Sequence, residues 1–310
     1  MIVVRRGTEQ GMERITDLAD GCWVHLIDPG VDEIARMSQE FGIPADFFTY
    51  PLDLDESPRI EKENGALLIV LRVPHVQGPQ ADIPFSTMPL GIILTERVIA
   101  TVCKLPSDLV EEFANGRPRS LSTTKRNRFF LRLFLETAKR YLRDLREINR
   151  QVDLLEDRLQ MSLRNREVLE LLKYQKSLTL FTTALKANQL MMARMQKGQA
   201  FRMYEEDEDL LEDVLTEIGQ AIQMTDISSG ILSQMMDAFA SIISNNLNVV
   251  MKFLASATII LALPTLVASV YGMNIELPLQ NHPFSFEIVM GGALLVALTV
   301  VVIFIRRDWL

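Results

Sequence analysis

The chain has 310 residues, a formal net charge of -8 and a composition in which 48% of the residues are hydrophobic. A nucleic-acid-binding protein needs a basic surface to meet phosphates, so this charge argues against that class of function. The mean hydropathy of +0.13 is high for a chain in which 23% of the residues are charged. The uneven distribution of charge explains this high mean hydropathy, because charged residues are frequent in residues 1–246 and almost absent after them.

The cysteines and histidines do not have the spacing of a metal site. Cys22 and Cys103 lie far apart in the sequence. Together with His25, His75 and His282 they do not form the spacing of a metal-ligand motif. Reduced, cytosolic thiols are therefore expected. The first residues, MIVVRRGTEQ, lack a basic start followed by a long apolar run, so no cleaved signal peptide is expected.

Residues 1–118 have the mixed pattern of a cytosolic α/β domain. CWVHLI is strand-like and ends at Asp-Pro-Gly, and residues 31–41 have helical apolar spacing that closes on Gly42. The segments GALLIVLRVPHV, PLGIILT and RVIATVCK are rich in Val and Ile, which favours strands. This pattern predicts an α/β domain with a small sheet.

The pattern of residues 119–205 predicts a helical hairpin. In the first half, apolar residues recur at intervals of three and four, which is typical of a long amphipathic helix packed on a partner. These residues are Ala138, Tyr141, Leu142, Leu145, Ile148, Val152, Leu155 and Leu159. A second helix is expected at about 168–197, before Gly198.

One very long helix is expected from about residue 206 to residue 270. Apolar positions keep helical spacing from Val214 to Ile242, and no proline interrupts the pattern before Pro264. At 1.5 Å per residue this stalk would be roughly 95 Å long. Such a helix is not stable alone, so it should pack against copies of itself.

Two uncharged apolar runs near the C-terminus predict membrane spans. Residues 253–270 and 288–305 contain no charged residue, and a span needs about 20 apolar residues. The first span is expected at about 249–270 and the second at 288–305, joined by an external loop at 271–287 and followed by a tail at 306–310. Lys252, Arg306 and Arg307 flank the spans, whereas the loop has no Lys or Arg. Both termini are therefore expected in the cytoplasm, with the chain in the cell (inner) membrane.

Small and polar residues form a stripe along the first span. Their spacing by threes and fours places them on one helical face: Asn248, Met251, Ala255, Thr258, Ala262, Thr265 and Ser269. The stripe is consistent either with close helix packing or with the wall of a narrow aqueous pore. Two spans cannot enclose a pore, so transport would require an oligomer. Pro264 is either a kink in this helix or a tolerated membrane proline.

Several motifs resemble the CorA family of divalent-cation transporters. They are NNLNVVMKFL, then YGMN at the end of the first span, a short loop, a second span and a terminal RRDWL, with WVHLID in the first domain. The resemblance implies an α+β membrane protein that assembles as a homopentameric funnel: a cytosolic α/β domain, a long helical stalk and two C-terminal transmembrane helices. It also implies transport of Mg²⁺, and often of Co²⁺ and Ni²⁺.

The resemblance assigns roles to residues of this region. It implies an entrance filter at Gly272, Met273 and Asn274, with Tyr271 as its structural support. It implies a pore line with a hydrophobic constriction at Met251 and Leu254, the whole line being Asn248, Met251, Leu254, Thr258, Ala262 and Thr265. Thr258 and Ala262 differ in kind from the residues of well-studied family members.

The chemistry of Mg²⁺ explains why an amide side chain suits the implied filter. Mg²⁺ keeps its waters, so a ring of Asn274 amides can bind the hydrated ion without fixed charge. Gly272 is expected to turn the backbone away from the helix and bring carbonyls inward. Glu276 and Glu287 either raise the local cation concentration or are ordinary loop charges.

The resemblance also implies regulatory Mg²⁺ sites between cytosolic domains. Asp213 falls at one ligand position and Asp237 on a family aspartate near the membrane. Thr49 and Tyr50 stand where the family has an acidic pair, and the neighbouring Asp53, Asp55 and Glu56 are candidate substitutes. The acidic run 205–213 is alternatively a solvated helix start.

Other functions remain open at this stage. A zinc transporter of the same superfamily usually carries Gly-Ile-Asn, so Met273 argues against it without excluding it. A membrane-anchored scaffold or sensor with a degenerate pore is the second alternative. An enzyme is disfavoured, because no catalytic triad, histidine cluster or phosphate loop occurs in the sequence. The expected partners are further copies of the chain, lipid and divalent cations, with no cofactor beyond Mg²⁺ as transported ion and regulatory ligand.

Overall fold

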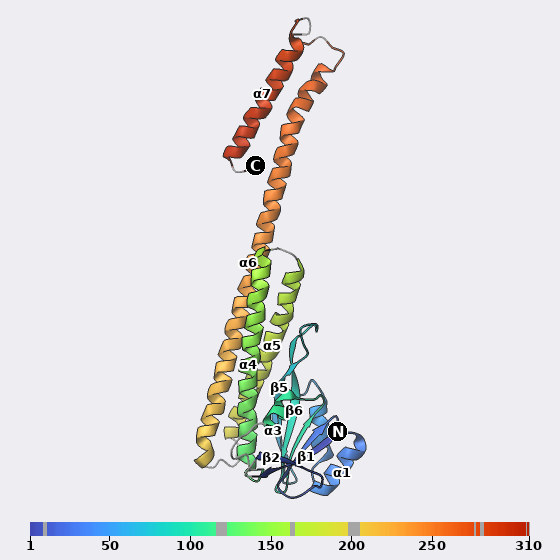
Figure 1. Cartoon of the computed structure of the whole chain (residues 1–310), viewed down its shortest axis with the longest axis vertical. Helices are drawn as coiled ribbons and strands as arrows, with labels where there is room; N and C mark the ends of the chain where they lie inside the picture. Colours follow the sequence, from blue (N-terminus) through green and yellow to red (C-terminus); the bar gives the residue numbers. More distant parts are fainter. Residues whose placement is uncertain are drawn as a thin grey trace. The chain divides into compact units, whose positions relative to one another are not determined.

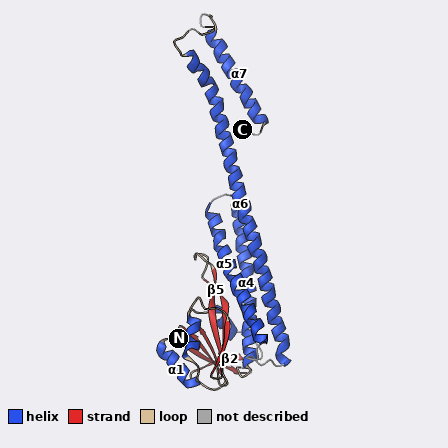
Figure 2. Ribbon diagram, turned by 180° about the vertical axis from the view of Figure 1, so that it is seen from behind, coloured by secondary structure: helices blue, strands red, loops and turns tan. Residues whose placement is uncertain are grey.

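A computed structural model describes most of the chain: residues 1–8, 11–115, 123–161, 165–197, 205–275, 277–279, 282–307 and 309. The chain divides into two compact units, Met1–Gln234 and Met235–Leu310. One helix, α6 (Glu208–Tyr271), runs through both, as the prediction of a single helix from about 206 to 270 required. Figures 1 and 2 show the elements from opposite sides.

The first unit contains a mixed seven-stranded sheet of order β2-β1-β3-β7-β6-β5-β4. Its strands are β1 (Ile2–Thr8), β2 (Gly11–Ile15), β3 (Cys22–Ile27), β4 (Arg59–Glu63), β5 (Ala66–Val76), β6 (Phe85–Leu94) and β7 (Ile99–Cys103). Only β3 and β7 are parallel. The prediction of a small sheet was wrong, because β1, β2 and β4 each carry charged residues, and β2 and β4 also lack the Val- and Ile-rich pattern of the inner strands.

Helices cover both faces of this sheet. The first face packs on α1 (Val31–Phe41) and α2 (Ala45–Thr49), and the short 3₁₀ turn η1 (Tyr50–Leu52) follows α2. The second face packs on α3 (Asp108–Asn115), α4 (Arg126–Met161), α5 (Asn165–Lys197) and the start of α6. Strand β5 shows the alternation clearly, because Leu68 and Val70 face one layer while Ile69 and Leu71 face the other. The predicted helices at 31–41 and 168–197 are confirmed.

A side chain of α5 continues the hydrogen bonding of β5 beyond the end of β4. The pairing of β4 with β5 stops at Arg59 and Val70, so β4 does not reach Arg72. The amide of Asn188 binds the Arg72 backbone: its Oδ1 accepts from the Arg72 N–H at 3.0 Å, and its Nδ2 donates to the Arg72 carbonyl at 2.8 Å. Asn188 is buried, and the Tyr141 hydroxyl donates to the same carbonyl at 2.9 Å. These bonds attach the helical hairpin to the sheet.

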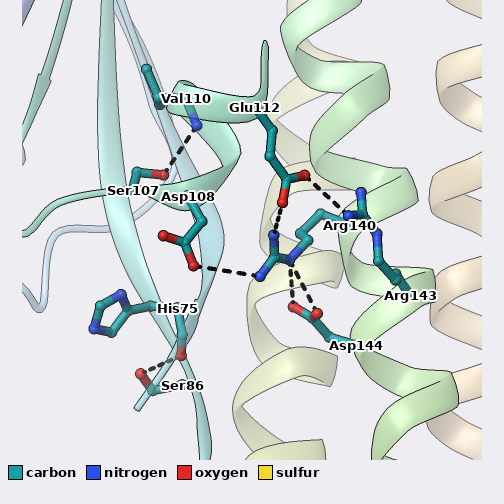
Figure 3. A network of polar contacts seen from close by, with 9 residues as sticks. All are labelled: His75, Ser86, Ser107, Asp108, Val110, Glu112, Arg140, Arg143 and Asp144. Carbon is teal, nitrogen blue, oxygen red and sulfur yellow. Dashed lines mark hydrogen bonds and ion pairs between the residues drawn. The ribbon is translucent and has the colours of Figure 1, made fainter. Parts of the chain in front are cut away.

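A charged network joins α3 to α4 (Figure 3). The Nε of Arg140 donates to both carboxylate oxygens of Asp144, at 3.1 and 3.2 Å, and its Nη1 donates to Glu112 at 3.0 Å. Glu112 also binds Arg143 at 3.0 Å. Burial raises the pKa of Asp144 to about 6, although the adjacent Arg140 guanidinium lowers it. The network therefore holds a partly desolvated carboxylate between two arginines.

Candidate functional site

Two helices are long and apolar enough to cross a membrane. Among the described residues, these are the helical stretch Glu205–Tyr271 and α7 (Ser285–Arg306), whose most apolar windows have mean hydropathies of 2.1 and 2.9. Only 6% and 11% of those windows are buried within the chain. A core helix of a soluble protein would be mostly buried, so this exposure favours the membrane reading.

Helix α7 covers one face of the last part of α6. Figures 1 and 2 both show the two running side by side within the second unit. Ser256 on α6 and both Ala293 and Ala297 on α7 are buried. Further along the same face of α6, Ile260 and Leu263 are half-buried. Small residues of this kind are common where membrane helices pack together.

The predicted pore positions lie on another face of α6. Each of Thr258, Ala262 and Thr265 comes two residues after a position on the α7 side, and two residues correspond to about 200° around a helix. All six positions of the predicted pore line are exposed in the single chain: Asn248, Met251, Leu254, Thr258, Ala262 and Thr265. The chain's own second span therefore leaves this face open.

The two threonines of the open face donate hydrogen bonds from their hydroxyl groups to backbone carbonyls. Thr258 Oγ1 donates to the Leu254 carbonyl and Thr265 Oγ1 to the Leu261 carbonyl, each at 2.8 Å. A hydroxyl has one donor and two acceptor lone pairs. Because the donor is occupied, each oxygen is left as an acceptor on the exposed face, which suits the water molecules around a hydrated cation.

The YGMN segment continues the last turn of α6. The N–H of Gly272 donates to the Ala268 carbonyl at 2.9 Å, and the N–H of Met273 donates to the Val270 carbonyl at 3.2 Å. Helix α6 ends at Tyr271 and the second of these bonds spans only three residues, so the chain leaves the helix at this turn. The φ of Gly272 lies outside the left-handed region, and an added Cβ would meet only carbonyl oxygens of its own last turn, at 3.3 and 3.5 Å.

The other residues of the predicted filter lie next to this turn. Met273 and Asn274 are exposed at the end of α6. The hydroxyl of Tyr271 donates to the Pro278 carbonyl at 3.2 Å, which ties the following loop to the helix end. Glu287 lies in the first turn of α7 and is exposed. Glu276 lies outside the described residues.

The candidate regulatory carboxylates do not form a metal site within one chain. The described part of the chain contains no group of three His, Cys, Asp or Glu residues able to hold a metal ion. Asp213 is exposed near the start of α6, and Asp53 and Asp55 are exposed after η1. Asp53 Oδ1 accepts the Asp55 N–H at 3.0 Å, and the Arg59 guanidinium lies 4.2 Å from the Tyr50 ring centroid.

Two residues of the acidic run pair with basic residues at the start of α4. Glu206 binds Lys125 at 2.8 Å, and the buried Asp207 lies 3.4 Å from Arg128. The hydrogen bond from Lys125 lowers the pKa of Glu206. The solvated-start reading of the run is thus wrong for Asp207, whose partner is 79 residues away in the sequence.

Comparisons with known proteins agree on one family. Residues 19–307 match the model of the CorA-like Mg²⁺ transporter protein family. The chain is 30% identical over 299 residues to the cobalt/magnesium transport protein CorA of Methanocaldococcus jannaschii, covering 93% of this chain and 91% of that protein. It is 22% identical to the Thermotoga maritima protein of the same name, covering 95% of this chain and 85% of that one. The complete structure of the M. jannaschii CorA magnesium transporter superposes with a TM-score of 0.86 at 24% identity, covering 100% of this chain and 99% of that one.

Proposed function

The chain belongs to the CorA family of Mg²⁺ transporter proteins, and from this we propose that it is a channel-like transporter of divalent cations, with Mg²⁺ as its main ion and Co²⁺ and Ni²⁺ as further ones. The observation that carries the proposal is the open face of α6. Its threonine acceptors lie about 200° from the face that α7 covers, so this surface is available to an aqueous path.

The path is formed between copies of the chain. Two spans per copy cannot surround a channel, and the open face of α6 needs a partner or water within the membrane. We propose a homopentamer in which five α6 helices surround one axis, as the family resemblance implies. The cytosolic domains then lie inside the cell with both termini, and the loop between α6 and α7 lies outside the inner membrane.

The proposed filter is the turn at the end of α6. Mg²⁺ gives up its waters reluctantly, and the exposed Asn274 offers an amide oxygen to those waters in each copy. Gly272 presents no side chain, and its φ lies outside the left-handed region. Its role here is therefore to leave space next to the axis.

The proposed gate is apolar. Met251 and Leu254 are exposed on the open face near the cytosolic end of the span, and rings of apolar side chains can close a pore by dewetting. No nucleotide is needed to drive transport. A divalent ion that moves inward across about 100 mV gains roughly 4.6 kcal/mol, twice the value per charge.

Regulation by Mg²⁺ would act between copies. We propose that Asp213 of one copy shares an ion with carboxylates of the next, with Asp53 and Asp55 as the candidate partners. The exposure of all three carboxylates supports this arrangement.

Uptake into proteoliposomes tests the proposed function. Vesicles containing the purified chain, with an inside-negative potential, are given Mg²⁺, Co²⁺, Ni²⁺ or Zn²⁺ in turn, and empty vesicles are the control. Mg²⁺ uptake above the control is expected, and it should be strongly reduced in Asn274→Ala. Preferred Zn²⁺ uptake would indicate the zinc-transporting relatives, and no uptake of any ion would indicate a scaffold or sensor.

A further inference from the structure

A cavity of about 600 Å³ lies in the first unit, between the sheet and the start of α4. Its wall combines the β4–β5 hairpin, the end of β6, the first residues of α4 and the 3₁₀ turn η2 (Glu205–Asp207), which directly precedes α6. Binding sites for small molecules usually enclose about 300–1,000 Å³. The cavity is therefore large enough for an organic ligand, and it is separate from the membrane-spanning segments.

Basic side chains outnumber acidic ones on this wall. The basic residues that line it are Lys62, Lys125, Arg126 and Arg128, and the carboxylates are Glu96, Glu206 and Asp207. Lys125 Nζ lies 2.8 Å from a carboxylate oxygen of Glu206. Arg128 Nη1 lies 3.4 Å from a carboxylate oxygen of Asp207. These four charges are balanced within the wall, and Glu96, the third carboxylate, is exposed.

Two basic side chains remain for a ligand. Neither Lys62 nor Arg126 forms an ion pair with a residue that the structure describes. The Nη1 of Arg126 donates to the neutral carbonyl of Thr95, which holds the guanidinium at the wall and leaves further N–H groups as donors. Lys62 is exposed on β4 and offers three more donors. Lysine and arginine donors of this kind bind phosphate groups.

The cavity also has an apolar part. Leu67 and Leu94 form a cross-strand pair of β5 and β6 and line the cavity beside the charged groups. Inorganic phosphate has no apolar surface with which to cover these leucines. A ligand that carries both an apolar group and phosphates would contact both parts of the wall, and burial of the apolar group would add to its affinity.

We propose that this cavity binds a nucleoside polyphosphate. The phosphates lie between Lys62 and Arg126, and the base lies against Leu67 and Leu94. The bound ligand connects the β4–β5 hairpin to the start of α4 and to the turn before α6. The inference goes beyond the proposed transport and does not depend on it, because every residue of the wall lies in the first unit.

Calorimetric titration of the purified full chain in detergent tests the proposal. The probe is ATP in the presence of EDTA, so that metal binding does not contribute to the signal. One site per chain is expected, and Lys62→Glu should weaken binding by about ten-fold or more, the effect of losing one charge-assisted hydrogen bond. The matched control is Arg14→Glu, which changes an exposed basic residue on β2, the opposite edge strand, and should bind ATP like the wild type.

Parts of the ligand test the two halves of the wall. Adenosine and pyrophosphate should each bind at least about ten-fold more weakly than ATP, because each lacks one set of contacts. Equal affinity for pyrophosphate and ATP would overturn the contact with the leucines. Equal ATP affinity in the wild type and Lys62→Glu, or no ATP binding to the wild type, would overturn the site.

Two further measurements separate binding from folding and from transport. Thermal unfolding without ligand should be the same in Lys62→Glu and the wild type, because Lys62 is exposed. ATP should increase the amide hydrogen-exchange protection of residues 62–67 and 125–128 in the wild type and not in Lys62→Glu. A failure of cation uptake by vesicles would refute the proposed function and leave the result of the ATP titration unchanged.

Discussion

The hydroxyl of Thr258 donates a hydrogen bond to the carbonyl of Leu254, one turn earlier in α6, at a distance of 2.8 Å. This bond holds the proton against the helix and leaves the oxygen as an acceptor on the exposed face. Thr299 of α7 makes the same bond to Leu295, also at 2.8 Å. The two threonines are thus matched in local structure and differ in the helix that carries them.

Replacing Thr258 by valine should therefore reduce Mg²⁺ uptake. Valine keeps the shape of the side chain but removes the acceptor, and a hydrogen bond to a water of the hydrated ion contributes about 1 kcal/mol, roughly five-fold in rate. Thr258→Ser should retain most of the uptake. The matched control is Thr299→Val, which should transport like the wild type. Equal uptake by Thr258→Val and the wild type would show that this oxygen does not face the ion.

Gly272→Ala should preserve folding and assembly but lower uptake. The φ of this residue is not in the left-handed region, so alanine is compatible with the conformation. The added methyl group would occupy space at the proposed filter. Size-exclusion chromatography and thermal unfolding should match the wild type, while vesicle uptake falls. Loss of assembly in this variant would instead give the glycine a structural role.

Asn188→Leu should destabilise the first unit strongly. It leaves the N–H of Arg72 without an acceptor and removes one donor to the Arg72 carbonyl, because the pairing with β4 stops at Val70 and supplies no replacement. An unsatisfied buried polar group costs about 1–3 kcal/mol. Gln189→Leu alters the next residue, which is exposed, and should change the free energy of unfolding by less than about 0.5 kcal/mol. Fluorescence of the buried Trp23 during unfolding of the full chain in detergent measures both.

The stability of the first unit should fall in acid because of His25. Burial lowers the pKa of His25 to about 4, whereas the unfolded chain takes up this proton at about pH 6.5. Between these values the unfolded state binds more protons, so the free energy of unfolding decreases as the pH falls, by at most about 1.4 kcal/mol per pH unit.

A comparison of pH slopes isolates this contribution. His25→Asn removes the titrating ring, so the wild type should lose stability more steeply than the variant between pH 6.5 and 4. Asp144, with its pKa raised to about 6, gives a slope of the opposite sign. Since Asp144 is present in both proteins, its effect cancels in the difference. Parallel slopes for the two proteins would contradict the buried, neutral state of His25.

The sequence predicted the parts of the molecule that repeat a local pattern. Helix α1 follows from the spacing of its apolar residues and from Gly42, and the long α6 follows from uninterrupted helical spacing. The sequence predicted the open face of α6 as a stripe of small and polar residues. It could not show whether α7 covers that stripe, because this depends on how the two helices pack. The pairs Lys125–Glu206 and Arg128–Asp207 join residues about 80 positions apart. A local sequence pattern cannot predict pairs at this separation. The charged edge strands β2 and β4 were missed because edge strands need no apolar alternation.

Thiol accessibility tests the central claim, that one face of α6 lines an aqueous path. The two native cysteines are buried, so single cysteines can be introduced into the otherwise unchanged chain and treated with a charged, membrane-impermeant thiol reagent. Cysteines at Thr258, Ala262 and Thr265 should be labelled in membranes, and those at Ser256, Ile260 and Leu263 should stay unlabelled. Equal labelling of both faces, or labelling of the α7-covered face alone, would contradict the account.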